Sequence, residues 1–369
     1  MLGNFLDLCR DFWRRHKRKV YITLGVLGSG YFLYKLYDAH SRRISDLERE
    51  LATERENDEL VKAQMQEHFE NVQRIADSTT LPHVMQYLST RVAEELDLAP
   101  LTERLMRGKG QPNTLTAAEK LELWDRLKIL SFTRMVLSVW AMTTLNLFIR
   151  VQVNILGRHL YINTARGLGN SHLLDEADLI DRDDEQQFLA IADFLSNYEI
   201  PTLIASIEAA TSEVLKGKQL KDYFNSSVLR ETIVRILDTF MSKGNPRQWL
   251  GYLIPEDNRI YKLVEPSGSG NEVHSHASKF EQLTEETRAV LSSAEFGNIL
   301  DISLKVAVDA IAEEIDMQSA IPLAKLLPRI AQMGQILLEE PNRQRYIQII
   351  RNTPEVELFF TVLYSSMPS

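Results

Sequence analysis

Cysteine is nearly absent from the sequence, with Cys9 as the only one in 369 residues. A lone cysteine cannot form a disulfide within the chain, which excludes a disulfide-stapled secreted domain and fits a reducing compartment. Proline is missing from residues 113–200, a stretch long enough for an uninterrupted helix. These two absences favour a fold that is built from long helices and packed without covalent cross-links.

Catalytic signatures are absent as well. The sequence has no P-loop, no dinucleotide-binding glycine fingerprint and no nucleophile elbow following a strand. His274 and His276 form the only close histidine pair, and they lie in a Ser/Gly-rich stretch without a cysteine or a third ligand nearby. The acidic residues 175–185 lack the spacing of a calcium-binding EF-hand. We therefore expect no enzyme activity, cofactor, metal or small-molecule substrate.

Positive charge is scarce except at the start of the chain. Residues 1–43 hold nine Lys or Arg against three acids, a net charge of +6, which leaves the remainder at −15 (33 basic against 48 acidic). A basic segment of this kind suits an anionic lipid surface. The acidic remainder would repel phosphates, which argues against nucleic acid as its partner.

A membrane anchor is predicted directly after the basic cluster. Residues 20–34 are uncharged and mostly apolar, and passing Lys35 extends the run to residue 37, which is long enough for a transmembrane helix. Residues 1–19 form a short amphipathic, basic head, whose lipid-facing cations are Arg14, Arg15, Lys17, Arg18 and Lys19. The glycines and the basic flank argue against a buried core helix, and the long head argues against a cleaved signal peptide. Asp7 and Asp11 argue against a mitochondrial presequence.

The longest helix is predicted over residues 116–161. Thr116 and Glu119 have the spacing of a capping box, so the helix should begin there. Its apolar stripe comprises Leu123, Leu127, Leu130, Leu137, Ala141, Leu145 and Phe148. From Met135 to Ile149 the helix is apolar on nearly every side, which indicates burial all round. A second membrane span is the rival interpretation, but polar residues dilute this segment, so we prefer a core helix.

The rest of the body also has helical periodicity. Helices are expected from Pro201 to about Lys243, and over Phe280–Ile315, Pro322–Leu338, Asn342–Asn352 and Glu355–Ser365. Residues 244–280, rich in Pro, Gly and Ser, are predicted to be a long surface loop. Residues 38–369 are therefore predicted to be one all-α domain. It would be an elongated helical bundle around one long buried helix, preceded by a single transmembrane helix.

Trp124 stands out on the long helix. At about 100° per residue it lies about 100° from Leu123, at the margin of the core stripe. Lys120 lies one turn earlier on the same side, and Leu127 nearly one turn later. This arrangement is typical of an anchor for a partner's amphipathic helix. A tryptophan that is covered by a neighbouring helix would give the same pattern, so both interpretations stay open.

Three segments resemble the peroxin-3 (peroxisomal biogenesis factor 3) family, and its plant members in particular. They are Leu121–Arg134 (LELWDRLKILSFTR), Arg150–Gly157 (RVQVNILG) followed by Tyr161, and Ile321–Pro328 (IPLAKLLP). The first segment is long and specific, and the order of basic cluster, glycine-bearing apolar run and polar helix at the start of the chain is also similar to the family.

The resemblance implies a single-pass protein of the peroxisomal membrane with a large domain in the cytosol. Such a domain docks peroxin-19, the soluble receptor that carries newly made membrane proteins, through the N-terminal amphipathic helix of peroxin-19. By match, Trp124, Lys120 and Leu127 are groove residues, with Leu105, Thr102 and Leu160 as neighbours. The positive-inside rule would predict the opposite orientation, but it describes translocon insertion. A structural tether between the peroxisome and other cellular structures is the alternative function, and a membrane-bound enzyme is a more distant one.

Overall fold

The structure is a computed structural model. It describes residues 63–64, 66–110, 116–169, 180, 182–243, 248–255, 279–315, 317, 319–340 and 342–365, without the side chains of 108–110 and 162–169. The chain divides into two compact units, Met1–Glu67 and His68–Ser369, and the described residues lie almost entirely in the second. The predicted basic head (1–19) and transmembrane helix (20–37) lie outside the described residues and stay predictions.

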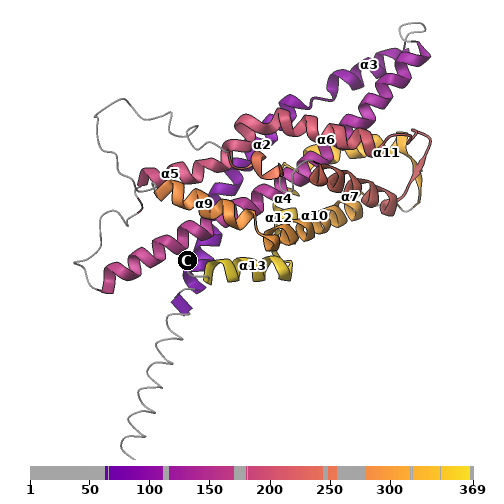
Figure 1. The fold of residues 1–369 in the computed structure, drawn as a ribbon. Helices are drawn as coiled ribbons and strands as arrows, with labels where there is room; N and C mark the ends of the chain where they lie inside the picture. Colours follow the sequence, from indigo (N-terminus) through magenta and orange to yellow (C-terminus); the bar gives the residue numbers. More distant parts are fainter. Residues whose placement is uncertain are drawn as a thin grey trace, which may run out of the picture. The chain divides into compact units, whose positions relative to one another are not determined.

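The described part of the second unit is built almost entirely of helices (Figure 1). Residues 68–75 are helical and lead into η1 (Ala76–Thr80). The α-helices that follow are α2 (Leu81–Glu95), α3 (Ala99–Gly110), α4 (Ala117–Gly169), α5 (Arg182–Ala190), α6 (Ile200–Val214), α7 (Ser226–Ser242), α9 (Lys279–Leu291), α10 (Ala294–Glu314), α11 (Leu323–Ile336), α12 (Asn342–Arg351) and α13 (Pro354–Ser365). Short helices η3 (Ile191–Asp193), η4 (Leu195–Glu199) and η5 (Gln248–Tyr252) and two strands, β1 (Tyr223–Phe224) and β2 (Ile321–Pro322), complete the described elements.

Helix α4 runs through the centre of this unit. It has 53 residues, or about 80 Å at 1.5 Å per residue. The predicted capping box starts it, because the Thr116 backbone N–H donates to Glu119 Oε2 (2.7 Å) and the Glu119 N–H donates to Thr116 Oγ1 (3.2 Å). The helix ends eight residues later than the periodicity predicted, because the glycines at 167 and 169 do not interrupt it.

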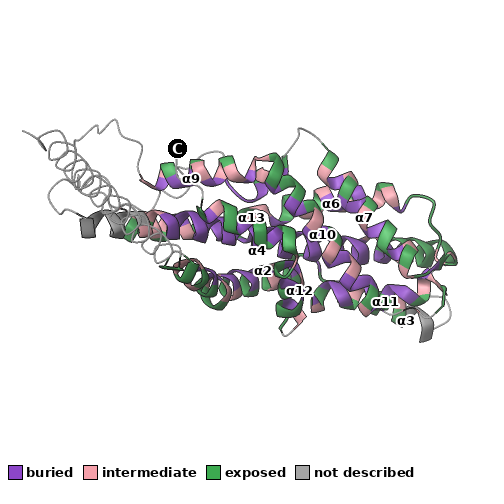
Figure 2. Cartoon of the chain, turned by 90° about the horizontal axis from the view of Figure 1, so that it is seen from below, coloured by how far each residue is buried: buried purple, intermediate pink, exposed green. Residues whose placement is uncertain are grey.

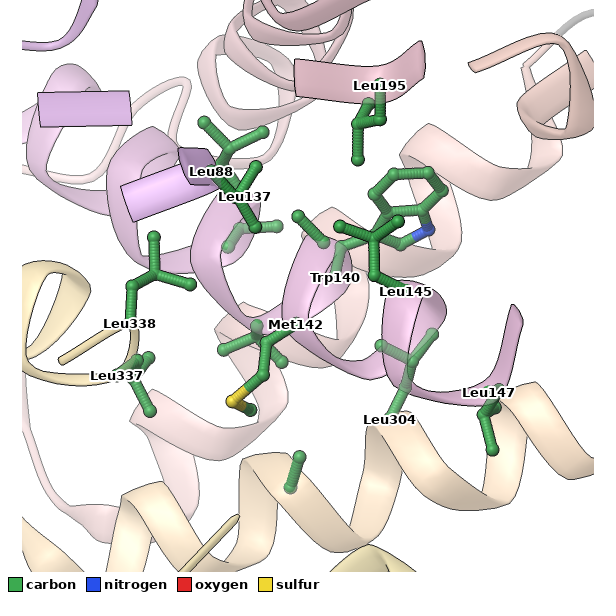
Figure 3. Close-up of a cluster of buried hydrophobic side chains, with 14 of the residues drawn as sticks. Leu88, Leu137, Trp140, Met142, Leu145, Leu147, Leu195, Leu304, Leu337 and Leu338 are labelled. Carbon is green, nitrogen blue, oxygen red and sulfur yellow. The ribbon is translucent and has the colours of Figure 1, made fainter. Parts of the chain in front are cut away.

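The middle of α4 is buried on every side, which confirms the prediction of a core helix. Every residue from Leu130 to Arg158 is buried, and α4 lies between other helices in Figure 2. Figure 3 shows Trp140, Met142 and Leu145 of α4 among leucines from other parts of the chain. The segment Ala117–Tyr161 is long and apolar enough to cross a membrane, but its most apolar part is completely buried within the protein. Neighbouring helices of the protein, rather than lipid, therefore surround this segment of α4.

Several polar side chains of α4 bond to the helices that surround it. Helices α11 and α6 make its most extensive contacts. Ser138 Oγ donates to the carbonyl of Gly334 in α11 (2.6 Å). The buried Arg150 guanidinium donates to Asp77 in η1 (3.0 Å), and Asp77 also accepts from Arg351 at the end of α12 (2.6 Å). These bonds fix the rotation and height of the outer helices against the central one.

A two-stranded antiparallel ladder joins the middle of the sequence to its later part. Tyr223 lies opposite Pro322, and Phe224 lies opposite Ile321. The turn before β1 is held to the start of α11, since the Leu323 N–H donates to the Asp222 carbonyl (2.8 Å) and the Ala324 N–H to the Leu220 carbonyl (2.9 Å). No strand pattern is visible in the sequence here, because each strand has only two residues.

Two further sequence predictions differ from the structure. Residues 248–255, placed in the surface loop 244–280, contain η5, whose Trp249 and Tyr252 are buried and followed by buried Leu253 and Ile254. Apolar and aromatic burial outweighs the loop-forming composition of the flanking residues. The helix predicted over Phe280–Ile315 is two helices, α9 and α10, because the Ser293 hydroxyl accepts from the Phe296 N–H (3.1 Å) and starts a new helix.

Candidate functional site

An apolar surface lies where α3 and the first turns of α4 pack together (Figure 1, upper right). Helix α3 begins with the Asp97 carboxylate accepting from the Ala99 N–H (2.9 Å). Leu98 is buried, while Leu101 and Leu105, three and seven residues later, are half-buried against the edge of the core. Met106 turns outward and is 64% exposed. One face of α3 therefore packs against the core beside α4. At the edge of that face, Met106 is exposed to solvent.

The first turns of α4 form the other side of this surface. The backbone N–H and the hydroxyl of Thr116 both donate to Glu119 Oε2 (2.7 and 2.8 Å). These bonds hold the pKa of the Glu119 carboxyl below its ordinary value, so this residue stays ionised at the N-terminus of the helix. Lys120 is exposed, and Leu121 is 65% exposed although it is a large apolar residue. A leucine that exposed next to other apolar side chains is typical of a partner contact.

Trp124 lies between the exposed turns and the buried part of α4. Its side chain is half-buried and packs against the edge of the core. Leu127, predicted both as part of the core stripe and as a neighbour of Trp124 in the groove, is only 8% exposed and belongs to the core. One turn beyond Trp124, the buried Lys128 donates to the Lys218 carbonyl (2.9 Å) and pairs with Asp125 (2.5 Å). Trp124 is thus partly covered by the core and partly exposed to solvent. We call Leu101, Leu105, Met106, Leu121 and Trp124 the α3–α4 surface.

Five of the six residues predicted for the site lie on α3 or on the first turns of α4, two elements that pack together, and their role in binding stays a prediction. Thr102 is exposed on α3, and its hydroxyl donates to the Leu98 carbonyl (2.9 Å). Leu105, Lys120 and Trp124 lie at the same end of α4, with Leu127 beneath them. Leu160 does not join them. It follows Trp124 by 36 residues of continuous helix, or about 54 Å, so its assignment to the same groove is wrong.

Three residues of the α3–α4 surface were missed by the sequence reasoning. Met106 and Leu121 are among the most exposed large apolar side chains that the structure describes, and Leu101 lines the same border. A signal for Leu121 was present, because it precedes Trp124 by three residues and so lies on an adjacent part of the helix. No sequence pattern indicated Leu101 or Met106, because their position relative to α4 depends on how α3 packs against α4.

The opposite end of α4 carries a cluster of polar and aromatic side chains. His68 Nδ1 and Tyr364 Oη are 2.5 Å apart, and the rings of His68 and Tyr161 are 5.4 Å apart. Burial raises the pKa of Tyr364 to about 12 and lowers that of His68. Arg158 and His159 of α4 both contact the Glu286 carboxylate of α9. The start of the second unit is therefore fixed beside Tyr161, about 55 Å along α4 from Trp124.

No catalytic constellation was found in the described residues. A hollow of about 370 Å³ lies between α6, α7 and η5, and aromatic rings of Phe240, Trp249 and Tyr252 line it. Ser206 Oγ and Tyr252 Oη, its paired polar atoms, hydrogen-bond each other (2.8 Å). Within the described ranges no group of three or more His, Cys, Asp or Glu side chains could hold a metal. His274 and His276 lie outside those ranges.

Comparison with known proteins places the chain in a family. The sequence profile of peroxin-3 matches residues 109–366. Peroxisome biogenesis protein 3-2 of Arabidopsis thaliana is 56% identical over 98% of this chain and all of its own length, and protein 3-1 of the same plant is 54% identical over the same shares. Peroxisomal biogenesis factor 3 of Homo sapiens is 27% identical over 96% of both chains. The resemblance to plant members is thus confirmed, and the chain belongs to the peroxin-3 family of peroxisome biogenesis factors.

Proposed function

We propose that this protein is a docking receptor of the peroxisomal membrane, which binds peroxin-19 and so receives newly made membrane proteins for insertion. The α3–α4 surface carries this proposal. It comprises two widely exposed apolar side chains, Met106 of α3 and Leu121 of α4, together with the half-buried Trp124. The function is one of binding rather than catalysis.

The chemistry of this surface fits an amphipathic helix. Such a helix places apolar side chains at positions i, i+3, i+4 and i+7 into a groove between two helices of its receptor. Trp124 supplies a large aromatic contact that packs against the edge of the core, the kind of residue that dominates binding energies. The exposed ammonium group of Lys120 lies one turn away on the same side and can pair with a carboxylate on the polar face of the partner.

The position of the surface supports a receptor role. The second unit begins beside Tyr161, and Trp124 lies at the far end of α4, about 55 Å away. Residues 20–37 are predicted to cross the membrane, with the second unit in the cytosol. In that case cargo would be received at a part of the second unit remote from His68, where this unit begins. Leu160 lies at the near end and would take no part in docking.

Calorimetry tests the proposal directly. The full-length chain in detergent should bind a synthetic peptide of the N-terminal amphipathic helix of peroxin-19, with one site per chain. A proline placed in the middle of the peptide should abolish binding, because it prevents the helix from forming. Absence of binding by the unmodified peptide would refute the receptor role and favour the structural tether.

A further inference from the structure

A short basic turn stands out in an otherwise acidic domain. Lys216, Lys218 and Lys221 lie within six residues between α6 and β1, while residues 44–369 carry a net charge of −15. All three lysines are exposed. Among the residues that the structure describes, none of the three has an ion-pair partner. The nearest carboxylates in sequence are occupied, because Glu213 pairs with Lys243 (3.1 Å) and Asp222 Oδ2 accepts from the Gln219 N–H (2.8 Å).

The turn is fixed in place. Gly217 has φ of 85°, a conformation that suits glycine, and lets the chain reverse directly after α6. The Lys218 N–H donates to the Leu215 carbonyl (3.0 Å), and the Asp222 N–H to the Gln219 carbonyl (3.0 Å). Lys218 Nζ lies 5.8 Å from the centre of the Phe224 ring. A charged segment held in this way loses little conformational entropy on binding a partner.

The basic turn lies next to the α3–α4 surface. The buried Lys128 donates to the Lys218 carbonyl (2.9 Å), which ties the turn to α4. Lys128 follows Trp124 by four residues, so the two side chains project from the same side of α4 one turn apart. Trp124 is therefore flanked by Lys120 on one side and by the basic turn on the other.

We propose that the basic turn, formed by Lys216, Lys218 and Lys221, is a second contact site that binds an acidic peptide segment adjoining the partner's amphipathic helix. This inference rests on the proposed docking function, because the α3–α4 surface has to hold the helix first. Three exposed ammonium groups on a fixed turn attract carboxylates without demanding one geometry. The acidic surroundings repel any part of the partner's acidic segment that strays from the turn, which sets the orientation of the bound helix.

An acidic peptide fits this turn better than other anions do. The turn is held to α4 one turn from Trp124, remote from Tyr161 where the second unit begins. A lipid surface that contacts the second unit near His68 and Tyr161 would therefore not reach the basic turn. Three lysines are also fewer cations than nucleic-acid binding usually requires, and the rest of the domain would repel a phosphate backbone.

Tailed peptides test the inference. The peroxin-19 helix peptide would be made with a run of glutamates at either end and, as a control, with a run of serines. One of the glutamate tails should raise affinity for the full-length chain by about threefold to tenfold at low ionic strength. The gain should disappear near 0.5 M salt, where the Debye length is only about 4 Å. Equal affinity of glutamate-tailed and serine-tailed peptides would overturn the proposal.

Charge-matched variants locate the effect. Replacing Lys216, Lys218 and Lys221 together by serine should remove the gain and leave binding of the serine-tailed peptide unchanged. Replacing the exposed Arg74, Arg235 and Lys305, none of which lies in the turn, by serine changes the net charge equally and should keep the gain. If both variants lose the affinity gain of the glutamate tail equally, the overall charge of the protein rather than the basic turn causes that gain, and the proposal is wrong. If no peptide binds, the docking function itself fails. Retention on phosphatidylserine vesicles that only the turn variant loses would assign the turn to lipid instead.

Discussion

The side chain of Trp124 is intermediate between core and surface, which sets what its removal should do. Because it is half-buried at the edge of the core, Trp124→Ala should cost about 1–2 kcal/mol of folding stability, less than the ~3–5 kcal/mol of a fully buried aromatic residue. Affinity for the peroxin-19 peptide should fall about 30-fold to 1000-fold. Urea unfolding and calorimetry on the same preparation measure both quantities.

Leu130→Ala is the matched control for that experiment. Leu130 is 9% exposed on the core side of α4, so its truncation should cost about 2–4 kcal/mol of stability and leave peptide affinity nearly unchanged in the folded protein. A Trp124→Ala protein that unfolds much more easily than the Leu130→Ala protein, or that binds the peptide normally, would show that Trp124 is a core residue and not an anchor.

Gly334 marks the closest approach of α11 to α4. A Cβ atom at this position would lie 3.0 Å from the Met135 backbone nitrogen and 3.1 Å from the Arg134 carbonyl carbon, and backbone atoms cannot give way cheaply. Gly334→Ala should therefore destabilise the fold by about 1–3 kcal/mol. Gly297 in α10 has open space around it, so Gly297→Ala should be neutral or stabilising by up to about 1 kcal/mol. Thermal unfolding of the two variants should differ in sign or clearly in size.

His159 should make stability depend on pH. Burial, followed by the nearby charges of Arg158 and Lys279, lowers its pKa from 6.5 to about 4, although Glu286 contacts the ring and opposes this. Below pH 6.5 the unfolded imidazole binds a proton that the folded one does not. Stability should therefore be unchanged by this group above pH 6.5 and fall by about 1–3 kcal/mol between pH 6.5 and pH 4.

The pH prediction is checked by urea unfolding in steps from pH 7.5 to pH 5. His159→Gln should have a smaller loss of stability between pH 6.5 and pH 5 than the unaltered chain, a range in which ordinary carboxylates stay ionised. An identical slope in both proteins would mean that another group binds the proton.

At the scale of elements, Asp77 joins three helical segments. Its carboxylate in η1 accepts from the buried Arg150 of α4 and from Arg351 at the end of α12. Arg150 is only 4% exposed, so Asp77→Ala would leave a guanidinium buried without its partner, at a cost of about 3–5 kcal/mol. Arg351 is 48% exposed, so Arg351→Ala should cost about 1 kcal/mol or less. Chemical denaturation distinguishes them, and similar losses would exclude a specific role for the buried pair.

At the scale of the whole molecule, anchoring and docking are assigned to different parts of the sequence. The apolar run 20–37 and its basic flank predict a membrane anchor, while the α3–α4 surface lies far along the second unit. Residues 1–40 fused to a fluorescent protein should therefore localise to peroxisomes in plant cells. Diffuse or mitochondrial fluorescence would contradict the predicted anchor without affecting the docking surface.

Local sequence patterns were sufficient for most helices. The capping box at Thr116, the leucine stripe of α4 and the proline at the start of α6 act within one or two turns, so they are visible in the sequence itself. The all-round apolar segment 135–149 also indicated that α4 is a core helix. Predictions failed where contacts between distant residues decided the outcome, as for the burial of Trp249 and the two-residue pairing of β1 with β2.

The sequence by itself determined the helical class of the fold, the central helix, the separation of a basic head from an acidic body, and Trp124 with Lys120 as part of a candidate site. Only the tertiary structure decided which residues share that site. It added Met106 and Leu121 and placed the basic turn beside Trp124 through Lys128, and it removed Leu160. The physical reason is that periodicity describes the direction in which a side chain points around one helix. Which side chains meet depends on how separate helices pack and on the length of a rigid helix between them.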